Sequence, residues 1–262
     1  MQDFKGKVVI VTGGAKGIGR GICRSFAEAG GNVMCNDIDA QAGAEIVEEA
    51  EQLAGDIQFF DGDVSNAAVC ASLVEETIDR WGGLDVLCNN VGIQPLNSYV
   101  PAHELPEEVW DQIIDVNLKS RFLMTKYSVP EMKRRGAGVI INIASVQGLQ
   151  STHDVSAYAA SKGGDLSLVR QLALEYAPDN IRVLAVNPGT IETPLVVEAT
   201  EAMGRSMAEH REVLSKAHPL GRIGQPADVG NVVRFLASEE AGFMTGEYVN
   251  VDGGLMAKGV WA

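Results

Sequence analysis

Residues 8–19 read Val8-Val9-Ile10-Val11-Thr12-Gly13-Gly14-Ala15-Lys16-Gly17-Ile18-Gly19, an apolar run that passes directly into a glycine-rich stretch. The apolar run has the length and composition of a buried strand, and a helical stretch, Arg20 to Ala29, follows the glycines. Glycines at these positions let the backbone turn tightly and let a pyrophosphate approach the N-terminus of that helix, where free N–H groups favour an anion. The order predicts a dinucleotide site, with cofactor contacts at Gly13, Lys16, Gly17, Ile18 and Gly19.

The glycine spacing is G-x-x-x-G-x-G, whereas the commoner dinucleotide fingerprint is G-x-G-x-x-G. Taken alone, the run could be an ordinary glycine-rich turn. Its position between a first strand and a first helix favours the cofactor interpretation.

Apolar strand candidates alternate with longer amphipathic stretches along the rest of the chain. This alternation predicts parallel βαβ units with helices on both faces of the sheet. We therefore expect a single doubly wound Rossmann-type α/β domain over residues 1–262, with a mostly parallel seven-stranded sheet. The cofactor part is expected at roughly 1–150, and the substrate loops at roughly 91–104, 145–157 and 190–220. The strand candidates are Val8–Thr12, Asn32–Asn36, Ile57–Phe60, Leu84–Asn89, Val139–Ala144, Arg182–Asn187 and Tyr248–Val251, and the helical candidates include Ala40–Ala54, Ala67–Arg80, Glu107–Arg135, Ala157–Tyr176 and Ala227–Ser238.

Ser145, Tyr158 and Lys162 form a second pattern. Tyr158 and Lys162 stand four residues apart in an expected helix, so the phenol and the ammonium share one helix face. A nearby cation lowers the pKa of a tyrosine, which is about 10 when unperturbed. This spacing is weakly specific alone, but with the glycine motif upstream it predicts Tyr158 as a general acid/base.

With both motifs in hand, the sequence resembles the short-chain dehydrogenase/reductase family over nearly its whole length. Asn89-Asn90-Val91-Gly92 is similar to the family's Asn-Asn-Ala-Gly segment, with Val91 replacing the usual alanine. The resemblance implies an oxidoreductase that acts on CH–OH groups with a nicotinamide cofactor. It places the catalytic tetrad on Asn117, Ser145, Tyr158 and Lys162, and further cofactor contacts on Asp63, Val64, Asn90, Gly92, Tyr158, Lys162, Pro188, Gly189, Ile191 and Thr193.

The roles of the tetrad are also implied by the resemblance. Tyr158 would remove the hydroxyl proton as NAD accepts hydride, or donate a proton when a carbonyl is reduced. Ser145 would orient the substrate oxygen, and Lys162 would lower the tyrosine pKa and hold the nicotinamide ribose. Asn117 would position a water in a proton relay. Taken singly, Ser145 could be a turn hydroxyl and Asn117 a buried polar bridge.

The prediction of NAD rather than NADP rests on Asp37. It lies at the end of the second strand candidate, where a carboxylate accepts hydrogen bonds from the adenosine ribose and repels a 2′-phosphate. Lys16 points the other way, because a basic residue there can accompany a 2′-phosphate in related enzymes. We expect NAD, with NADP as the weaker alternative.

The loops expected to line the substrate pocket are polar. A steroid or acyl chain would more often meet apolar and aromatic side chains, so these loops favour a sugar, polyol or small cyclic alcohol. Glu192 adjoins the nicotinamide segment and is predicted to bond a substrate hydroxyl. The alternative for each polar side chain is exposure to solvent. The candidate substrate contacts are Gln94, Ser145, Gln147, Gln150, His153, Tyr158 and Glu192, with Asn97 as a further possibility.

Residues 188–195 and 219–226 resemble a branch that contains fucose-type sugar dehydrogenases and a 17β-hydroxysteroid dehydrogenase. An NAD-dependent hydroxysteroid dehydrogenase is therefore the alternative function, weakened because the steroid-oxidising member has an aromatic residue where Glu192 stands. Reduction of acyl-carrier-protein thioesters is less expected, since it typically uses NADPH and a basic docking face. A non-catalytic dinucleotide sensor is disfavoured by the intact tetrad, and an epimerase or dehydratase by length and glycine spacing.

Composition limits the partners. The 262-residue chain carries a net charge of −14, which argues against nucleic acid or an anionic membrane surface as a partner. It has no apolar stretch of about 18 residues and no signal-like N-terminus, so we expect a cytoplasmic protein. No metal is predicted, because the histidines His103, His153, His210 and His218 lack ligand spacing, and buried, reduced thiols are expected at Cys23, Cys35, Cys70 and Cys88.

The family commonly forms two-fold-symmetric tetramers through two long helices, here roughly Glu107–Arg135 and Ala157–Tyr176. A homotetramer is therefore expected. Trp261 near the C-terminus would either fray or pack against a neighbouring subunit.

Overall fold

In the computed structural model, which describes residues 3–202 and 204–259, seven strands form one parallel sheet of order β3-β2-β1-β4-β5-β6-β7. The chain crosses from β3 at one edge back to β4 beside β1, so the strand order reverses between β1 and β4, where such sheets bind ligands. The doubly wound fold is confirmed, and the sheet is wholly rather than mostly parallel. The strands are β1 (Val8–Thr12), β2 (Asn32–Asp37), β3 (Asp56–Asp61), β4 (Val86–Asn89), β5 (Gly138–Ile143), β6 (Ile181–Pro188) and β7 (Tyr248–Val251).

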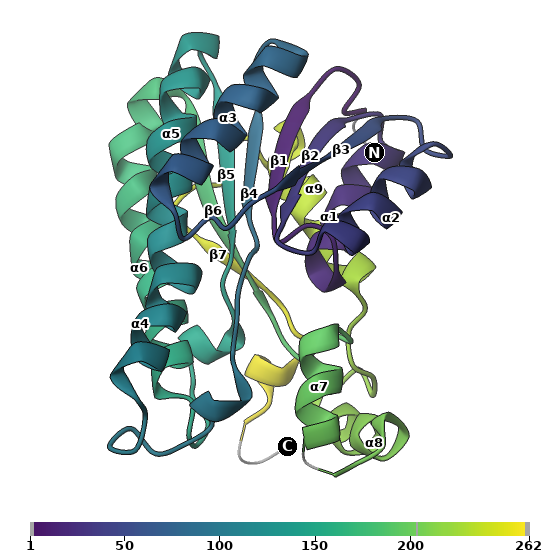
Figure 1. The fold of residues 1–262 in the computed structure, drawn as a ribbon, viewed down its shortest axis with the longest axis vertical. Coiled ribbons are helices and arrows are strands. Elements are labelled where there is room, and N and C mark those ends of the chain that lie inside the picture. Colours follow the sequence, from purple (N-terminus) through teal and green to yellow (C-terminus); the bar gives the residue numbers. More distant parts are fainter. Residues whose placement is uncertain (1–2, 203, 260–262) are drawn as a thin grey trace.

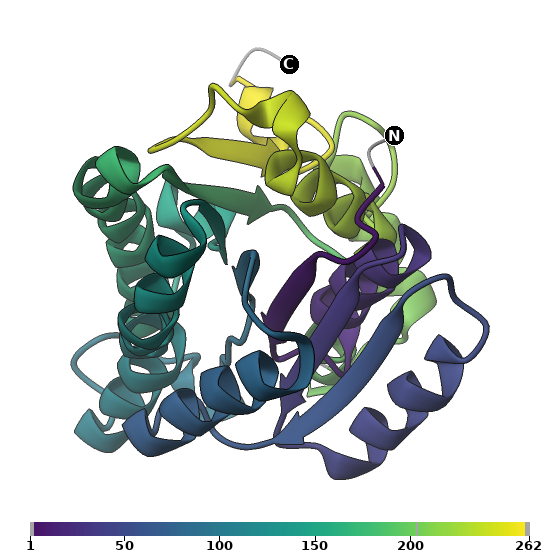
Figure 2. The same cartoon turned by 90° about the horizontal axis from the view of Figure 1, so that it is seen from above.

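Helices cover both faces of this sheet (Figure 1). One layer holds α1, α2 and α9, the other holds α3 to α6, and α7 and α8 lie beyond the carboxyl ends of the strands. Seen from above, the sheet twists between the two layers from β3 to β7 (Figure 2). The helices are α1 (Gly17–Glu28), α2 (Ala40–Ala50), α3 (Ala67–Trp81), α4 (Glu107–Ile114), α5 (Ser120–Arg135), α6 (Ser156–Tyr176), α7 (Pro194–Ala202), α8 (Met207–Ala217) and α9 (Pro226–Ala237).

The core lies on both faces of the sheet because its central strands are buried on both sides. Successive side chains of a strand point to opposite faces. Val9 and Val11 accordingly pack with Phe26 of α1, whereas Ile10 packs with Leu123 of α5. The continuous apolar run of β1 is what a two-sided core requires.

The prediction of one continuous helix over Glu107–Arg135 is wrong at the centre of that range. A π-helical turn, Asp115–Lys119, separates α4 from α5. The segment 190–220, expected as a substrate loop, is also not a continuous loop, since it contains α7 and α8. Helix α8 begins with a capping box between Ser206 and Glu209.

The cysteines follow the prediction: Cys23, Cys35, Cys70 and Cys88 are free and buried. Among the helices that the structure describes, none combines the length and apolar character needed to cross a membrane. Trp261 lies outside the described residues, so its predicted packing stays a prediction.

Candidate active site

The glycine turn is held by the neighbouring strand end. Asn90 follows β4, and its side-chain amide donates to the carbonyls of Thr12 (3.0 Å) and Gly13 (2.8 Å). A Cβ atom on Gly19 would lie only 2.0 Å from the Gly13 carbonyl oxygen, so no larger residue fits there. Helix α1 begins after Lys16 without a side-chain cap. Its first N–H groups are therefore suited to an anion such as a pyrophosphate.

The predicted selector Asp37 lies beside this turn. Its carboxylate accepts hydrogen bonds from the backbone N–H groups of Ala15 (3.1 Å), Ile38 (2.8 Å) and Asp39 (3.2 Å). Lys16 forms an ion pair with Asp39, and this hydrogen bond raises the pKa of Lys16. The end of β2 therefore holds two carboxylates, and the nearby cation is already engaged.

Two predicted cofactor positions offer little side-chain surface to a ligand. The Val64 side chain is buried in the core, whereas the neighbouring Asp63 is exposed and its carboxylate accepts the N–H of Ser65 (2.9 Å). Ile191 is 4% exposed and also packs in the core, which leaves its backbone for a cofactor. Thr193, in contrast, abuts Gly17, with its methyl carbon 3.1 Å from the position of a Cβ there.

Ser145, Tyr158 and Lys162 come together at the carboxyl end of β5. Ser145 follows that strand and accepts the N–H of Gln147 at 3.1 Å. Lys162 lies one turn after Tyr158 on α6, donates to the Ile143 carbonyl at 2.8 Å, and places Nζ 5.5 Å from the centroid of the tyrosine ring. The predicted helix-face argument therefore holds geometrically.

The predicted effect of Lys162 on the tyrosine needs correction. Burial raises the pKa of Tyr158, and the contributions that lower it are the Ser145 hydrogen bond and the charge of Arg121. Burial, assisted by Arg121, lowers the pKa of Lys162 itself to about 7. Lys162 therefore loses much of its charge near neutral pH, because burial disfavours its ammonium.

Arg121 is a site residue that sequence reasoning missed. It is fully buried and pairs with Asp165, which is also fully buried, at 3.4 Å. Asn142 of β5 donates to the other Asp165 oxygen (2.6 Å) and accepts from Asn89 of β4 (2.9 Å). The Arg121 charge within this buried polar chain lowers the pKa of Tyr158. No spacing in the sequence links its members.

Asn117 occupies the π-helical turn and clamps the segment after β4. It accepts the N–H of Ile93 (2.8 Å) and donates to the Ile93 carbonyl (2.9 Å) and to Ser161 (3.3 Å). The side chain is fully buried. It is therefore a buried bridge in this structure, and its predicted role in a water relay remains a prediction.

The predicted substrate residues divide into two groups. Gln94 and Gln147 are partly buried, and each has one buried side-chain atom without a hydrogen-bond partner, Nε2 of Gln94 and Oε1 of Gln147. The side chains of Asn97, Gln150 and His153 are exposed. Among the predicted substrate residues, these two glutamines therefore have buried polar atoms that lack a hydrogen-bond partner.

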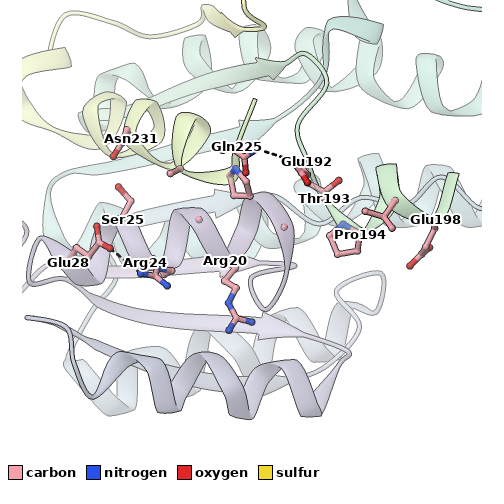
Figure 3. A pocket seen from close by; sticks show the side chains of 15 residues that line it. Arg20, Arg24, Ser25, Glu28, Glu192, Thr193, Pro194, Glu198, Gln225 and Asn231 are labelled. Atoms are coloured by element: carbon pink, nitrogen blue, oxygen red, sulfur yellow. Dashed lines mark hydrogen bonds and ion pairs between the residues drawn. The ribbon is translucent and has the colours of Figure 1, made fainter. Parts of the chain in front are cut away.

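Glu192 already has protein partners. Its carboxylate forms an ion pair with Arg211 of α8 and accepts from Gln225 at 2.9 Å (Figure 3). It lines a cavity of about 780 Å³ between α1, the start of α9 and residues 192–198, and Ser145, Tyr158 and Lys162 are not among the lining residues. Glu192 follows the segment predicted to meet the nicotinamide, but its carboxylate is directed at Arg211.

The histidines also divide. His103 and His153 are exposed, whereas His210 and His218 are buried. Within residues 3–202 and 204–259, no three histidine, cysteine or acidic side chains are grouped so that they could hold a metal ion.

Comparisons with known proteins agree with this geometry. The family described as Enoyl-(Acyl carrier protein) reductase matches residues 13–256. A cyclohexanol dehydrogenase of Acinetobacter sp. (strain SE19) is 36% identical over 257 residues, which are 98% of each chain. A 3-oxoacyl-acyl-carrier-protein reductase of Thermotoga maritima is 38% identical and covers 97% of this chain and 99% of its own. The crystal structure of a putative short-chain alcohol dehydrogenase from Sinorhizobium meliloti 1021 has a TM-score of 0.90 at 31% identity and covers 98% of both chains.

A parallel sheet with a glycine turn and a grouped serine, tyrosine and lysine is typical of a nicotinamide-dependent oxidoreductase of alcohols and carbonyls. The chain belongs to the short-chain dehydrogenase/reductase family.

Proposed function

We propose that this enzyme interconverts a secondary alcohol and its ketone with NAD, and that the alcohol is a sugar, a polyol or a small cyclic alcohol. The observation that carries the proposal is the convergence of Ser145, Tyr158 and Lys162 at the end of β5, on the same edge of the sheet as the glycine turn. The relative named a cyclohexanol dehydrogenase supports a small cyclic substrate. The finer resemblance to sugar and steroid dehydrogenases remains a prediction.

The residues of this chain supply proton transfer and positioning, and the bound nicotinamide supplies or accepts the hydride. Ser145 holds the substrate oxygen, and Tyr158 exchanges the proton with that oxygen. Burial raises the pKa of the phenol, whereas the Ser145 hydrogen bond and the Arg121 charge lower it. Ser145 and Arg121 therefore stabilise the phenolate that forms when the proton leaves for solvent. Lys162 is positioned to hold the nicotinamide ribose.

The preference for NAD rests on the end of β2. A 2′-phosphate would meet the Asp37 carboxylate there, and an uncompensated like charge at this distance is unfavourable. Lys16 could have offset that repulsion, but it pairs with Asp39. This arrangement also argues against the NADPH-dependent reduction of acyl-carrier-protein thioesters, although one relative carries that name.

Gln94 and Gln147 support a substrate with a second oxygen. A buried amide atom without a partner costs free energy that a polar ligand can recover. We expect, within the proposed class, that diols and sugars are better substrates than simple cyclic alcohols.

The first experiment is an assay of reduced nicotinamide formation with NAD and NADP across sugars, polyols, cyclic alcohols and hydroxysteroids. Tyr158→Phe should lower turnover by about 10²- to 10⁴-fold while NAD binding, measured by calorimetry, persists. Near-normal turnover in this variant would sink the assignment of Tyr158. Turnover of steroids alone would favour the hydroxysteroid alternative, and silence across the panel would favour a sensor.

A second experiment tests the glutamines. We expect a higher kcat/KM for cyclohexane-1,2-diol than for cyclohexanol, and a fall of about tenfold in this ratio for Gln147→Leu or Gln94→Leu. The exposed Gln150→Leu should leave the ratio unchanged. An equal ratio in all four proteins would mean that the amides do not contact substrate.

A further inference from the structure

His218 lies where the end of α8, the segment after β6 and the turn after β7 meet. It follows the last turn of α8 and is only 3% exposed. Its ring nitrogen Nε2 lies 3.0 Å from where a Cβ on Gly189 would stand, and its own Cβ lies 3.3 Å from the corresponding point on Gly253. The imidazole is therefore packed between the segment after β6 and the turn after β7.

Both ring nitrogens bond to backbone groups. The N–H of Thr190 donates to Nε2 (3.2 Å), and Nδ1 donates to the Leu214 carbonyl (2.8 Å). A backbone N–H can only donate and a carbonyl can only accept, so the pair of bonds requires the tautomer with hydrogen on Nδ1. One side chain thus connects helix α8 to the segment 188–193.

The segment 188–193 has two further ties near this point. The N–H of Gly224 donates to the Thr190 carbonyl (2.8 Å), and Glu192 pairs with Arg211 of α8. At its far end, Thr193 abuts Gly17 of the glycine turn.

We propose that His218 is a positioning residue that fixes segment 188–193 relative to α8. It contacts no reacting atom, and it acts through the Thr190 N–H. The inference rests on the proposed function only in that segment 188–193 is taken to meet the nicotinamide half of the cofactor. The adenosine half would depend on the glycine turn and Asp37.

Two variants separate the two hydrogen bonds. His218→Asn keeps a donor near the Nδ1 position but has no atom that reaches Thr190. His218→Gln places its carbonyl oxygen near the Nε2 position and can accept from Thr190. His218→Asn should therefore fail to hold segment 188–193 in place, and His218→Gln should still hold it.

The test measures binding without a substrate, so it stands even if the proposed reaction is wrong. We expect His218→Asn to weaken NADH binding about tenfold, while ADP-ribose, which lacks the nicotinamide, binds as in the wild type. Hydrogen exchange should quicken in residues 188–193, and His218→Gln should restore both properties. The proposal is overturned if His218→Asn binds NADH as the wild type does, or if it binds ADP-ribose as much more weakly as it binds NADH. It is also overturned if His218→Gln binds NADH as weakly as His218→Asn does.

Discussion

Lys162 combines a titratable ammonium with near-complete burial. Its pKa is lowered from 10.5 to about 7, chiefly by desolvation. The folded protein therefore holds this proton less tightly than the unfolded chain does. Between pH 7 and about 10.5 the unfolded state binds more protons, so this residue makes the free energy of unfolding rise with pH in that window.

Replacement of Lys162 by Met should remove this pH dependence. As pH rises above 7, we expect the free energy of unfolding of the wild type to increase relative to that of Lys162→Met, by at most about 1.4 kcal/mol per pH unit. Urea denaturation of both proteins at pH 6 to 9 measures the difference. A constant difference across this range would mean that Lys162 is solvated or compensated in the folded state.

Arg121 and Asp165 show why some site residues escaped prediction. Glycine and the Tyr-x-x-x-Lys spacing are local signals, because the turn and the helix face are local structures. Arg121 and Asp165 meet only because α5 and α6 pack side by side over β5, 44 residues apart in the chain. Each reads alone as an ordinary surface charge, and only the tertiary packing gives them a role.

The π-helical turn Asp115–Lys119 is the element that sets Asn117. It adds backbone between α4 and α5, and it directs the asparagine amide at Ile93. Such turns occur frequently at functional sites. A helical periodicity over 107–135 could not reveal it, because the same apolar pattern fits a continuous α-helix.

Deletion of the exposed Lys119 tests this element. Removing one residue should restore a regular helix and rotate Asn117 by about 100° relative to α5. We expect loss of turnover together with faster hydrogen exchange in residues 91–94. Lys119→Ala is the matched control and should behave as the wild type, since an exposed i,i+4 ion pair with Asp115 contributes little. Full activity in the deletion variant would contradict the role of the π-turn.

At the scale of the whole molecule, the parallel sheet brings distant motifs to one edge. The glycine turn, Asn90, Ser145 and Pro188 all follow carboxyl ends of strands, and the strand order places those ends side by side. Order and spacing of these motifs were enough to predict the fold. The helices within 190–220 were not predicted, because α7 and α8 depend on packing against residues far away in the chain.

Assembly is the remaining question at this scale, and we propose a homotetramer that uses α4, α5 and α6. These helices leave large apolar side chains in solvent: Trp110 is 38% exposed, Phe122 51% and Leu174 77%. Exposed apolar side chains of this size on one helical layer are typical of a surface that another subunit covers.

Placing charge on this layer should break the assembly. We expect the double variant Phe122→Glu, Leu174→Glu to sediment as a smaller species than the wild type at micromolar concentration, because each glutamate would have to be buried unpaired in the interface. Leu220→Glu, which charges an equally exposed apolar position outside these helices, should leave the mass unchanged. A monomeric wild type would refute the tetramer, and an unchanged tetramer in the double variant would move the interface to another face of the molecule.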